Sequence, residues 1–411
     1  MRKIIGLTGV KTSGKSTAFN MIKELVPGAR EIQLAKKLKD VCSQVFDIPR
    51  NYFDDQSKKE ATLDNLIYLD RKNISAVIEA FGFEPLYDSH VRPHVAADQN
   101  AQYEQYRRPT KRDVFLATME QIVPWAELCA VIEPHYPKPG NGRPPVGLER
   151  MLRMYFVQHW FNLADAACED ALIDSTAMRR FVGIDLGRER VPDATTLLKF
   201  RRLLETHKLG EALFAKVGEV LQASGLKVGT GTIVDATIIG APSSTKNKDK
   251  KRDPEMHQTK KGKQYYFGMK MHIGVDSQTG LAHSAMVTAA NVHDKHPLPD
   301  LLHGHEQEVY GDSAYVSQQE LIRSKAPDAV DRTNRRVREG SPTEDLERLI
   351  NRAKSKVRSR VEHVFAVVKR LWGFNKVRYR GLAKNATRSF VALGLANIYL
   401  ARGPLMGQIR V

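Results

Sequence analysis

The stretch Thr232-Ile233-Val234-Asp235-Ala236-Thr237-Ile238-Ile239 places one carboxylate in the middle of an almost continuous apolar run. Such a run is typical of a central strand that is buried on both faces, so the stretch predicts an α/β fold built around it. An ionised carboxylate in that position is costly unless a cation offsets its charge. Asp235 is therefore a candidate functional residue, and a buried, hydrogen-bonded aspartate is the structural alternative.

Three further strands are predicted downstream. One apolar face alternates along the first of them, with Phe267, Met269, Met271, Ile273 and Val275. The turn at 276–280 leads into residues 281–288, which completes an antiparallel hairpin. After a short helix, Glu308-Val309-Tyr310-Gly311-Asp312 predicts a brief strand that ends in an acid. Asp312 is the second candidate, with a strand-end cap as its alternative.

A long helix is predicted over residues 344–371, followed by an apolar helix at about 386–402. The first has an apolar stripe at three- and four-residue steps, formed by Leu346, Leu349, Ile350, Ala353, Val357, Val361, Val364, Val368 and Leu371. Arg358, Glu362 and Lys369 lie together along the edge of this stripe. Such a row can hold metal and grip phosphate, whereas the alternative is a weak surface salt bridge between residues four apart.

The order of these features is strand with Asp235, hairpin, strand ending in Asp312, and helix with Glu362. Three carboxylates that come together can bind two Mg²⁺ ions about 4 Å apart. These ions activate water or a 3′-hydroxyl and stabilise the leaving oxygen, which is the requirement of phosphodiester chemistry. We therefore expect a metal-dependent nuclease-like site.

Residues from about 108 to 405 resemble insertion-sequence transposases of the insertion sequence 5 family, which carry three catalytic carboxylates. The matching stretches are Ile233-Val234-Asp235-Ala236-Thr237, Ala290-Asn291-Val292-His293-Asp294, Tyr310-Gly311-Asp312-Ser313-Ala314-Tyr315, Arg358-Ser359-Arg360-Val361-Glu362-His363-Val364-Phe365 and Arg378-Tyr379-Arg380-Gly381-Leu382-Ala383-Lys384-Asn385. The family spaces an arginine four before its glutamate and a lysine seven after it, as Arg358 and Lys369 are spaced here. A tyrosine that is frequent three positions before that arginine is Ser355 in this chain.

The resemblance implies a ribonuclease-H-like catalytic domain, a mixed sheet with helices, over 227–405. It implies cleavage and strand transfer at the terminal inverted repeats of an insertion sequence, without a covalent protein–DNA intermediate. The implied catalytic and metal-binding residues are Asp235, Asp312 and Glu362, with Mg²⁺ or Mn²⁺ as cofactor. The implied DNA-binding residues are Arg358, Lys369 and Arg378. By the same resemblance His293 lies near the active site, and the protein is bacterial and associated with the nucleoid.

Residues 114–222 are predicted to be mostly helical, and they resemble the DNA-end-binding domain of the same family. Basic and aromatic residues mix there: Arg150, Arg153, Arg179, Arg180, Trp160 and Phe181. Such mixtures can bind DNA, but solvated helix faces beside core aromatics are the commoner cause. We expect a homodimer on double-stranded DNA, since two element ends and the target DNA must be brought together.

The first 95 residues predict a different segment. Gly9-Val10-Lys11-Thr12-Ser13-Gly14-Lys15-Ser16-Thr17 follows a predicted strand and precedes a predicted helix, as in a phosphate-binding loop. Backbone N–H groups would cradle phosphates, Lys15 would reach the β- and γ-oxygens, and Ser16 would bind Mg²⁺. Residues 1–95 resemble the opening of phage-type deoxynucleoside monophosphate kinases. About half of such a kinase is absent, so we expect a truncated α/β segment with weak or no ATP binding, joined through 96–113.

Composition limits the remaining choices. The net charge of +17 favours a polyanionic partner, and the excess lies almost entirely beyond residue 100. Three cysteines give no disulfide framework, and no apolar run reaches the length of a membrane span, so we expect a cytoplasmic protein with no membrane partner. Six histidines between 272 and 305 fit no standard zinc spacing. The alternatives are an ATP-dependent nucleotide kinase with a basic appendage, and a DNA-binding protein without catalysis.

Overall fold

The computed structural model describes residues 108–140, 144–226, 229–246, 250–338 and 340–409, and these belong to one compact unit, Arg108–Val411. The phosphate-loop residues Gly9, Gly14, Lys15, Ser16 and Thr17, the truncated segment at 1–95 and most of the predicted junction lie outside the described residues. The first part of the unit is helical, as predicted. Its elements are α5 (Lys111–Ile122), α6 (Trp125–Ile132), η3 (Glu133–His135), α7 (Leu148–Trp160), α8 (Asp165–Asp174), α9 (Thr176–Val182), α10 (Ala194–Thr206) and α11 (Leu209–Ala223).

A mixed sheet follows, and the predicted strand around Asp235 lies inside it. The strands are β1 (Gly231–Gly240), β2 (His257–Lys261), β3 (Gln264–Asp276), β4 (Ala282–Ala289), β5 (Glu308–Tyr310) and β6 (Val330–Asp331). Their order is β2-β3-β1-β5-β6, with β4 also paired to β3. β1 runs antiparallel to β3 and parallel to β5. The predicted β3–β4 hairpin is confirmed, and the side chains of Met269, Met271, Ile273 and Val275 are fully buried.

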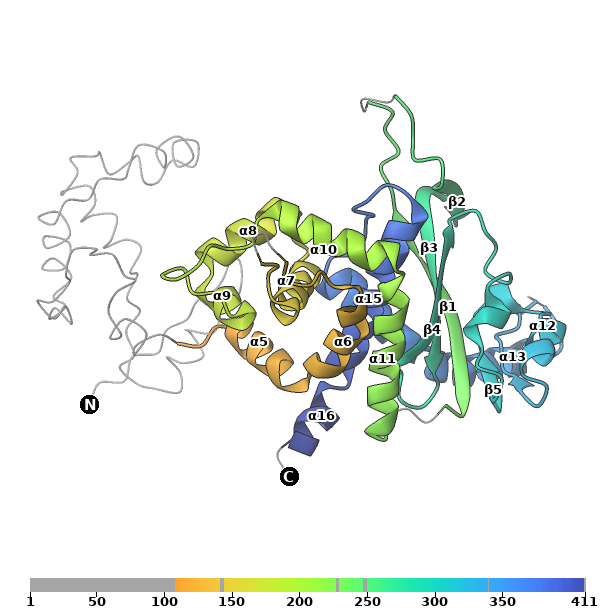
Figure 1. Cartoon of the computed structure of the whole chain (residues 1–411). Coiled ribbons are helices and arrows are strands. Elements are labelled where there is room, and N and C mark those ends of the chain that lie inside the picture. Colours follow the sequence, from red (N-terminus) through yellow and green to blue (C-terminus); the bar gives the residue numbers. More distant parts are fainter. Residues whose placement is uncertain (1–107, 141–143, 227–228, 247–249, 339, 410–411) are drawn as a thin grey trace, which may run out of the picture. The chain divides into compact units, whose positions relative to one another are not determined.

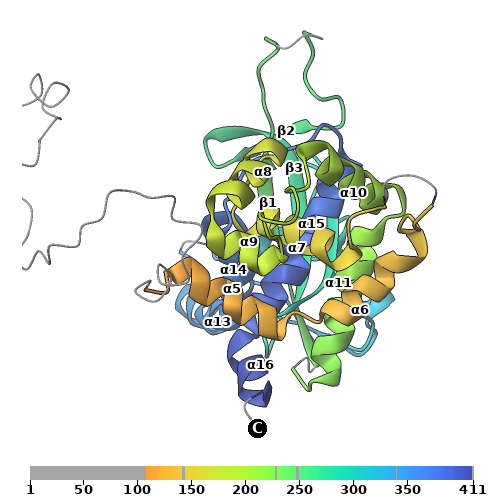
Figure 2. The same ribbon diagram turned by 60° about the vertical axis from the view of Figure 1, so that its left-hand side comes forward.

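Helices cover both faces of the sheet (Figure 1). On one face, α11 and α15 (Leu382–Leu400) pack together, and α15 lies between the amino-terminal helices and the strands in both views (Figure 2). Ile233 and Ile239 of β1 belong to this core, which is continuous with that of the helical part. On the other face, Val234 packs with η4 (Leu298–Leu301) and α12 (Gln319–Lys325). Helical part and sheet are thus joined by one hydrophobic core.

The helix predicted over 344–371 has the predicted bounds, but it is interrupted at Ser359 and changes to a π-helical turn near its end. The segment consists of α13 (Glu344–Arg358), α14 (Arg360–Phe365) and a π-helical turn, η6 (Ala366–Leu371). At the break, the Ser359 hydroxyl donates to the Lys356 carbonyl (2.8 Å), a local bond that competes with the regular helical ladder. The expectation of a buried stripe is wrong over its first half, because Leu346, Leu349 and Ile350 are 57%, 65% and 43% exposed. Within the stripe, Val361, Val364 and Val368 are fully buried, whereas Leu371 at its end is 55% exposed.

The predicted carboxyl-terminal helix is confirmed as α15, and α16 (Arg402–Ile409) follows it. Within the described residues, no single helix is both long and apolar enough to cross a membrane. Two sharply bent pairs, Lys111–Ile122 with Trp125–His135 and α15 with α16, meet that length and composition only when taken together.

Asn397 fastens α15 to β4 at a fully enclosed position. Its Nδ2 donates to the Ala282 carbonyl (2.6 Å) and its Oδ1 accepts from the Ala282 amide (2.9 Å). Asn397→Ala leaves both backbone groups buried without partners, so we expect the free energy of unfolding to fall by about 3 kcal/mol. Urea unfolding of the full chain measures it. Asn351→Ala is the control, since Asn351 makes the same two-way contact with the Arg335 backbone near the surface. Equal losses in the two variants would contradict the role of burial.

Candidate active site

Asp235 lies inside β1 and Asp312 lies just beyond β5, at matching positions relative to the pairing of these two parallel strands. β1 and β5 are paired up to Ile233 and Tyr310, which lie opposite each other. Each aspartate comes two residues after that last pair, and Asp235 is still paired with Ile273 of β3 there. Because side chains alternate along a strand, the equal spacing from the pair directs both carboxylates to the same side of the sheet. Asp312 also caps η5 (Ser313–Tyr315), because its Oδ1 accepts from the Ala314 amide (2.8 Å).

Gly311 allows β5 to end close to β1. A Cβ atom at this position would lie 3.0 Å from Cδ2 of Tyr315, 3.2 Å from Cγ2 of Val234 and 3.3 Å from Cγ2 of Thr333. Those distances are tighter than most real contacts, so a larger residue would push the strand end outward. The glycine before Asp312 thereby keeps this carboxylate near β1.

Arg358 links Asp235 to Glu362. α14, which carries Glu362, packs against β1. One guanidinium nitrogen, Nη1 of Arg358, lies 2.8 Å from Oδ2 of Asp235 and 3.7 Å from Oε1 of Glu362. The Asp235 side chain is only 14% exposed, whereas that of Glu362 is 58% exposed. The arginine and the glutamate predicted from their spacing therefore do reach the strand aspartate, despite the break at Ser359.

The pKa of Asp235 shows how negative charge is crowded here. This pKa is raised to about 6: burial is the largest cause, the Ala236 amide and Arg358 oppose it, and the nearby Asp312 and Glu362 add to it. All three carboxylates are thus close enough to interact electrostatically. Additional positive charge at this point would relieve their mutual repulsion.

Two family models match the chain. Residues 227–398, which include all three carboxylates, match the transposase DDE domain, and residues 103–203 match a transposase domain (DUF772). The chain is a DDE transposase. Together the matches cover about two thirds of its length, and no solved structure matched it. A DDE domain has a ribonuclease-H-like fold, which the mixed sheet with helices on both faces fits. The transposase cuts and joins DNA, and its class uses divalent metal ions.

The donor set suits such an ion, although its ligands are not gathered in this arrangement. Carboxylate oxygens are the ligands that hard divalent cations prefer. Within the described ranges, however, no three histidine, cysteine, aspartate or glutamate side chains converge closely enough to hold a metal. Arg358 lies between two of the carboxylates instead. Its Nε is buried without a hydrogen bond, so the guanidinium is only partly satisfied in this position. By the type of their donor atoms, the three carboxylates fit such a cation.

The three predicted DNA-binding residues of the transposase lie in different places. Lys369 lies against the same strand as Asp235, where its Nζ donates to Oγ1 of Thr237 (3.0 Å) and to the Ile238 carbonyl (2.9 Å). Burial and the nearby Lys261 lower the pKa of Lys369. Arg378 instead donates to Oδ1 of Asn162 (2.7 Å), in the loop between α7 and α8. Arg358 and Lys369 are thus at the carboxylates and Arg378 is not.

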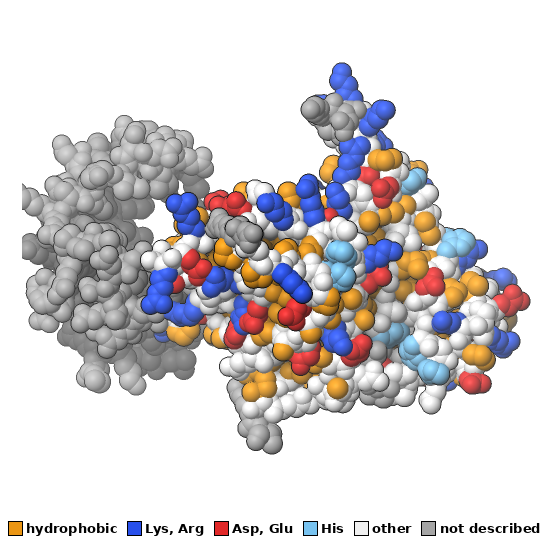
Figure 3. Space-filling model, in the orientation of Figure 1, with side chains coloured by type: hydrophobic (Ala, Val, Ile, Leu, Met, Phe, Trp, Pro, Cys, Tyr) orange, Lys and Arg blue, Asp and Glu red, His pale blue; other side chains and the backbone are white. Residues whose placement is uncertain are grey.

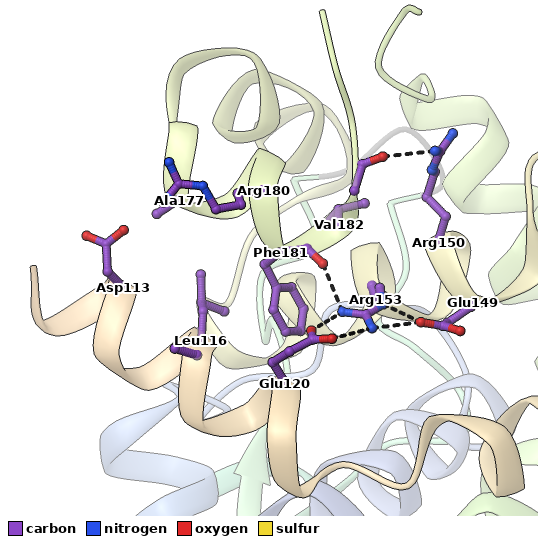
Figure 4. A pocket seen from close by; sticks show the side chains of 12 residues that line it. Asp113, Leu116, Glu120, Glu149, Arg150, Arg153, Ala177, Arg180, Phe181 and Val182 are labelled. Atoms are coloured by element: carbon purple, nitrogen blue, oxygen red, sulfur yellow. Dashed lines mark hydrogen bonds and ion pairs between the residues drawn. The ribbon is translucent and has the colours of Figure 1, made fainter. Parts of the chain in front are cut away.

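In the helical part, Arg150, Arg153 and Arg180 line a cavity of about 640 Å³ between α5, α7 and α9 (Figure 4), whereas Arg179 donates to the Ile173 carbonyl. Arg153 points into an acidic pair, Glu120 and Glu149, and its guanidinium lies 4.2 Å from the ring centre of Trp125. Arg150 pairs with Glu189 (2.5 Å). Trp160 and Phe181 are buried in the core. For Arg153 and the two aromatic residues, this arrangement matches the commoner cause, a helix face beside core aromatics.

Sequence reasoning missed a polar cluster behind the carboxylates. Lys270 donates to Oδ1 of Asp294 (2.9 Å), and Nδ1 of the fully buried His272 lies 3.7 Å from the same oxygen. The Tyr315 hydroxyl is buried without a hydrogen bond, and Asp294, Asp235 and Asp312 all raise its pKa after burial itself. Asp294 and Tyr315 both lie inside the quoted motifs, which was the available signal. The position of Tyr315 near Asp294, Asp235 and Asp312 depends on tertiary packing, which the spacing of residues in the sequence could not reveal.

Proposed function

We propose that this transposase belongs to the insertion sequence 5 family and cuts DNA at the terminal inverted repeats of its element. Asp235, Asp312 and Glu362 are the proposed catalytic and metal-binding residues, with Mg²⁺ or Mn²⁺ as the cation. When bound, such ions supply the positive charge that favours attack of water or a 3′-hydroxyl on phosphorus and stabilises the leaving oxygen. The observation that supports this most is the matching position of Asp235 and Asp312 beyond the last β1–β5 pair.

Arg358 holds Asp235 in place before DNA binds. Its ion pair with Asp235 (2.8 Å) offsets the cost of a largely buried carboxylate and joins the end of α13 to β1. A phosphate of the DNA offers the guanidinium a bidentate partner that a single Asp235 oxygen does not. We infer that Arg358 turns to the DNA backbone when the site is loaded, and so leaves the three carboxylates to face one another.

The basic surface beside the site suits a DNA backbone. Lysine and arginine side chains gather on the loop that projects before β2 and on the β2–β3 hairpin (Figure 3). The exposed ones are Lys246, Lys250, Lys251, Arg252, Lys260, Lys261 and Lys263. This surface continues to Lys369 through Lys261, whose charge lowers the pKa of Lys369. We propose that double-stranded DNA crosses it, while the helices of residues 114–222 recognise the element end.

We further propose that the transposase acts as a homodimer on terminal-repeat and target DNA in the bacterial cytoplasm, at the nucleoid. Arg378 is retained as a DNA-binding residue of this proposal, through its place at the Asn162 loop of the helical part. The alternative of an ATP-dependent nucleotide kinase gains no support, since both matched models describe transposase domains.

The test is cleavage of labelled DNA that carries the inverted repeats flanking this gene, with the full chain. We expect cuts at the repeat ends with Mg²⁺ or Mn²⁺, none with a chelator, and product ends that a polymerase can extend because they carry 3′-hydroxyls. A DNA of scrambled repeat sequence is the control. Binding of the repeats without cutting, in the presence of Mg²⁺, would contradict the proposed activity.

A further inference from the structure

Helix α13 turns its polar side toward the body of the protein. Its contacts with the preceding segment are all polar: Asn351 bonds the Arg335 backbone in both directions, Ser355 accepts from Asn334 (3.0 Å), and Lys354 donates to the Thr333 carbonyl (2.9 Å). No residue of this helix is buried. α13 lies beside β5 and α12 at the edge of the sheet (Figure 1). Val357, near the end of the helix, packs against the main core, whereas Leu346, Leu349 and Ile350 are exposed. The apolar side of the first three turns therefore faces away from the core.

That outward side is aliphatic. Leu346, Leu349 and Ile350 are spaced three and four residues apart, so they form one patch on the helix. The other large apolar side chains exposed in the described part of the chain stand apart from one another in sequence. A strongly amphipathic helix normally buries its apolar side, so this patch indicates a contact with another surface.

The distribution of charge along α13 indicates which surface the aliphatic patch contacts. The first turn of α13 is acidic, with Glu344, Asp345 and Glu347, and the last turn carries Lys356 and Arg358. On the exposed side, Asp345 and Lys356 flank the same edge of the aliphatic patch at opposite ends of the helix. A helix with this gradient is complementary to itself when inverted, because the acidic turn of one copy then meets the basic turn of the other.

We propose that the aliphatic side of α13 packs antiparallel against α13 of a second copy of the chain. Asp345 of one copy then lies opposite Lys356 of the other, and this pair occurs twice, related by a two-fold axis. This inference rests on the proposed function, because it supplies the contact by which two DNA ends are held together. It places that contact directly before the helix that carries Glu362.

The contact is small. A helix of 15 residues is about 22 Å long, and a pair of such helices buries less than a standard interface of about 800 Å² per partner. We therefore expect weak dimerisation of the free protein. Two copies that bind one DNA molecule have a high effective concentration relative to each other. The same contact is therefore expected to form in most of the DNA-bound pairs.

Sedimentation velocity of the full chain, alone and with a duplex that carries both inverted repeats, tests the patch. Leu349→Lys is expected to weaken self-association by about tenfold or more. The residue is 65% exposed, so the fold does not depend on it. Val114→Lys is the matched control, since Val114 is 58% exposed on α5, and it should leave self-association unchanged.

Charge reversal tests the orientation. Asp345→Lys and Lys356→Asp each place like charges opposite each other twice, so each alone should weaken self-association by about fivefold. The two changes together restore opposite charges and should return it to the wild-type value. A parallel pair would not show this restoration.

Either of two results would overturn the inference. The first is a wild-type chain that stays monomeric at every concentration, with and without DNA. The patch would then be covered by something other than a second copy, such as residues 1–107 or another protein. The second is an unchanged dimer in Leu349→Lys. Self-association is measured without catalysis, so a dimer that cuts no DNA would refute the proposed function and leave this inference standing.

Discussion

Replacing Glu362 by glutamine is expected to abolish DNA strand cleavage and to leave DNA binding intact. Glutamine keeps the size of the side chain but removes the charge of a proposed metal ligand. The side chain is 58% exposed and its one ion-pair contact, to Arg358, is long at 3.7 Å, so the fold should not change. We expect the cleavage rate to fall by about 10³-fold or more, because the three carboxylates would act together and the loss of one disables the set.

The measurement is single-turnover cleavage of the repeat DNA at saturating protein, with affinity measured separately by mobility shift. Glu320→Gln is the control, because Glu320 is an exposed carboxylate on α12. A Glu362→Gln variant that still cuts at a rate near that of the wild type would remove this residue from the catalytic set. Weakened binding with an unchanged rate on bound DNA would make it a DNA contact instead.

Arg358→Ala is expected to reduce cleavage by about 100-fold at pH 7, the range seen when one preorganised charge contact is removed. Arg358 is one of the groups that lower the pKa of Asp235 from the level set by burial and by Asp312 and Glu362. Without it, that pKa rises above about 6. Asp235 then ionises only at higher pH, so the acidic limb of the pH–rate profile should shift upward by about one unit.

Cleavage rates between pH 5 and 9 measure this shift. Arg358→Lys keeps the positive charge, so its acidic limb should stay near that of the wild type even where its rate is lower. Arg348→Ala, on the exposed side of α13, is the control for substitution of a nearby arginine. An acidic limb that does not move in Arg358→Ala would show that Asp235 is not the group that titrates in catalysis.

Much of the catalytic core could be predicted from local pattern. The apolar run around Asp235 predicted a strand with neighbours on both sides, and the alternation from Phe267 to Val275 predicted one half of a hairpin. Both signals depend on burial within one segment, which is why they were reliable. The meeting of Asp235 with Asp312 then follows from parallel pairing of β1 and β5.

The helix at 344–371 shows where such reasoning fails. A period of three to four residues identifies an apolar face, but not the surface that this face meets. For Val361 and Val364 that surface is the core of the same chain, whereas Leu346 and Leu349 face outward. The break at Ser359 depends on a hydroxyl that turns back onto its own backbone. Helix propensities summed along the sequence do not predict this interruption.

Arg378 illustrates a second limit. Its motif predicted a DNA contact, which stays a prediction, and its side chain bonds to Asn162 and to the Leu163 carbonyl more than two hundred positions earlier in the chain. Pairing at such separation is set by the packing of α15 between helices and sheet, and no local pattern records it. Arg358 could be placed because the helix and the strand that it joins were both predicted.

The core that joins the amino-terminal helices to one face of the sheet bears on the spacing between the DNA sequence that is recognised and the bond that is cut. Ile233 of β1 and Leu213 of α11 belong to the same packed interior. Under the proposed function, the bases that are recognised and the phosphate that is cut are then held by one stiff body. The number of base pairs between the recognised sequence and the cut is then set by the distance between the recognition helices and the catalytic strand within the protein.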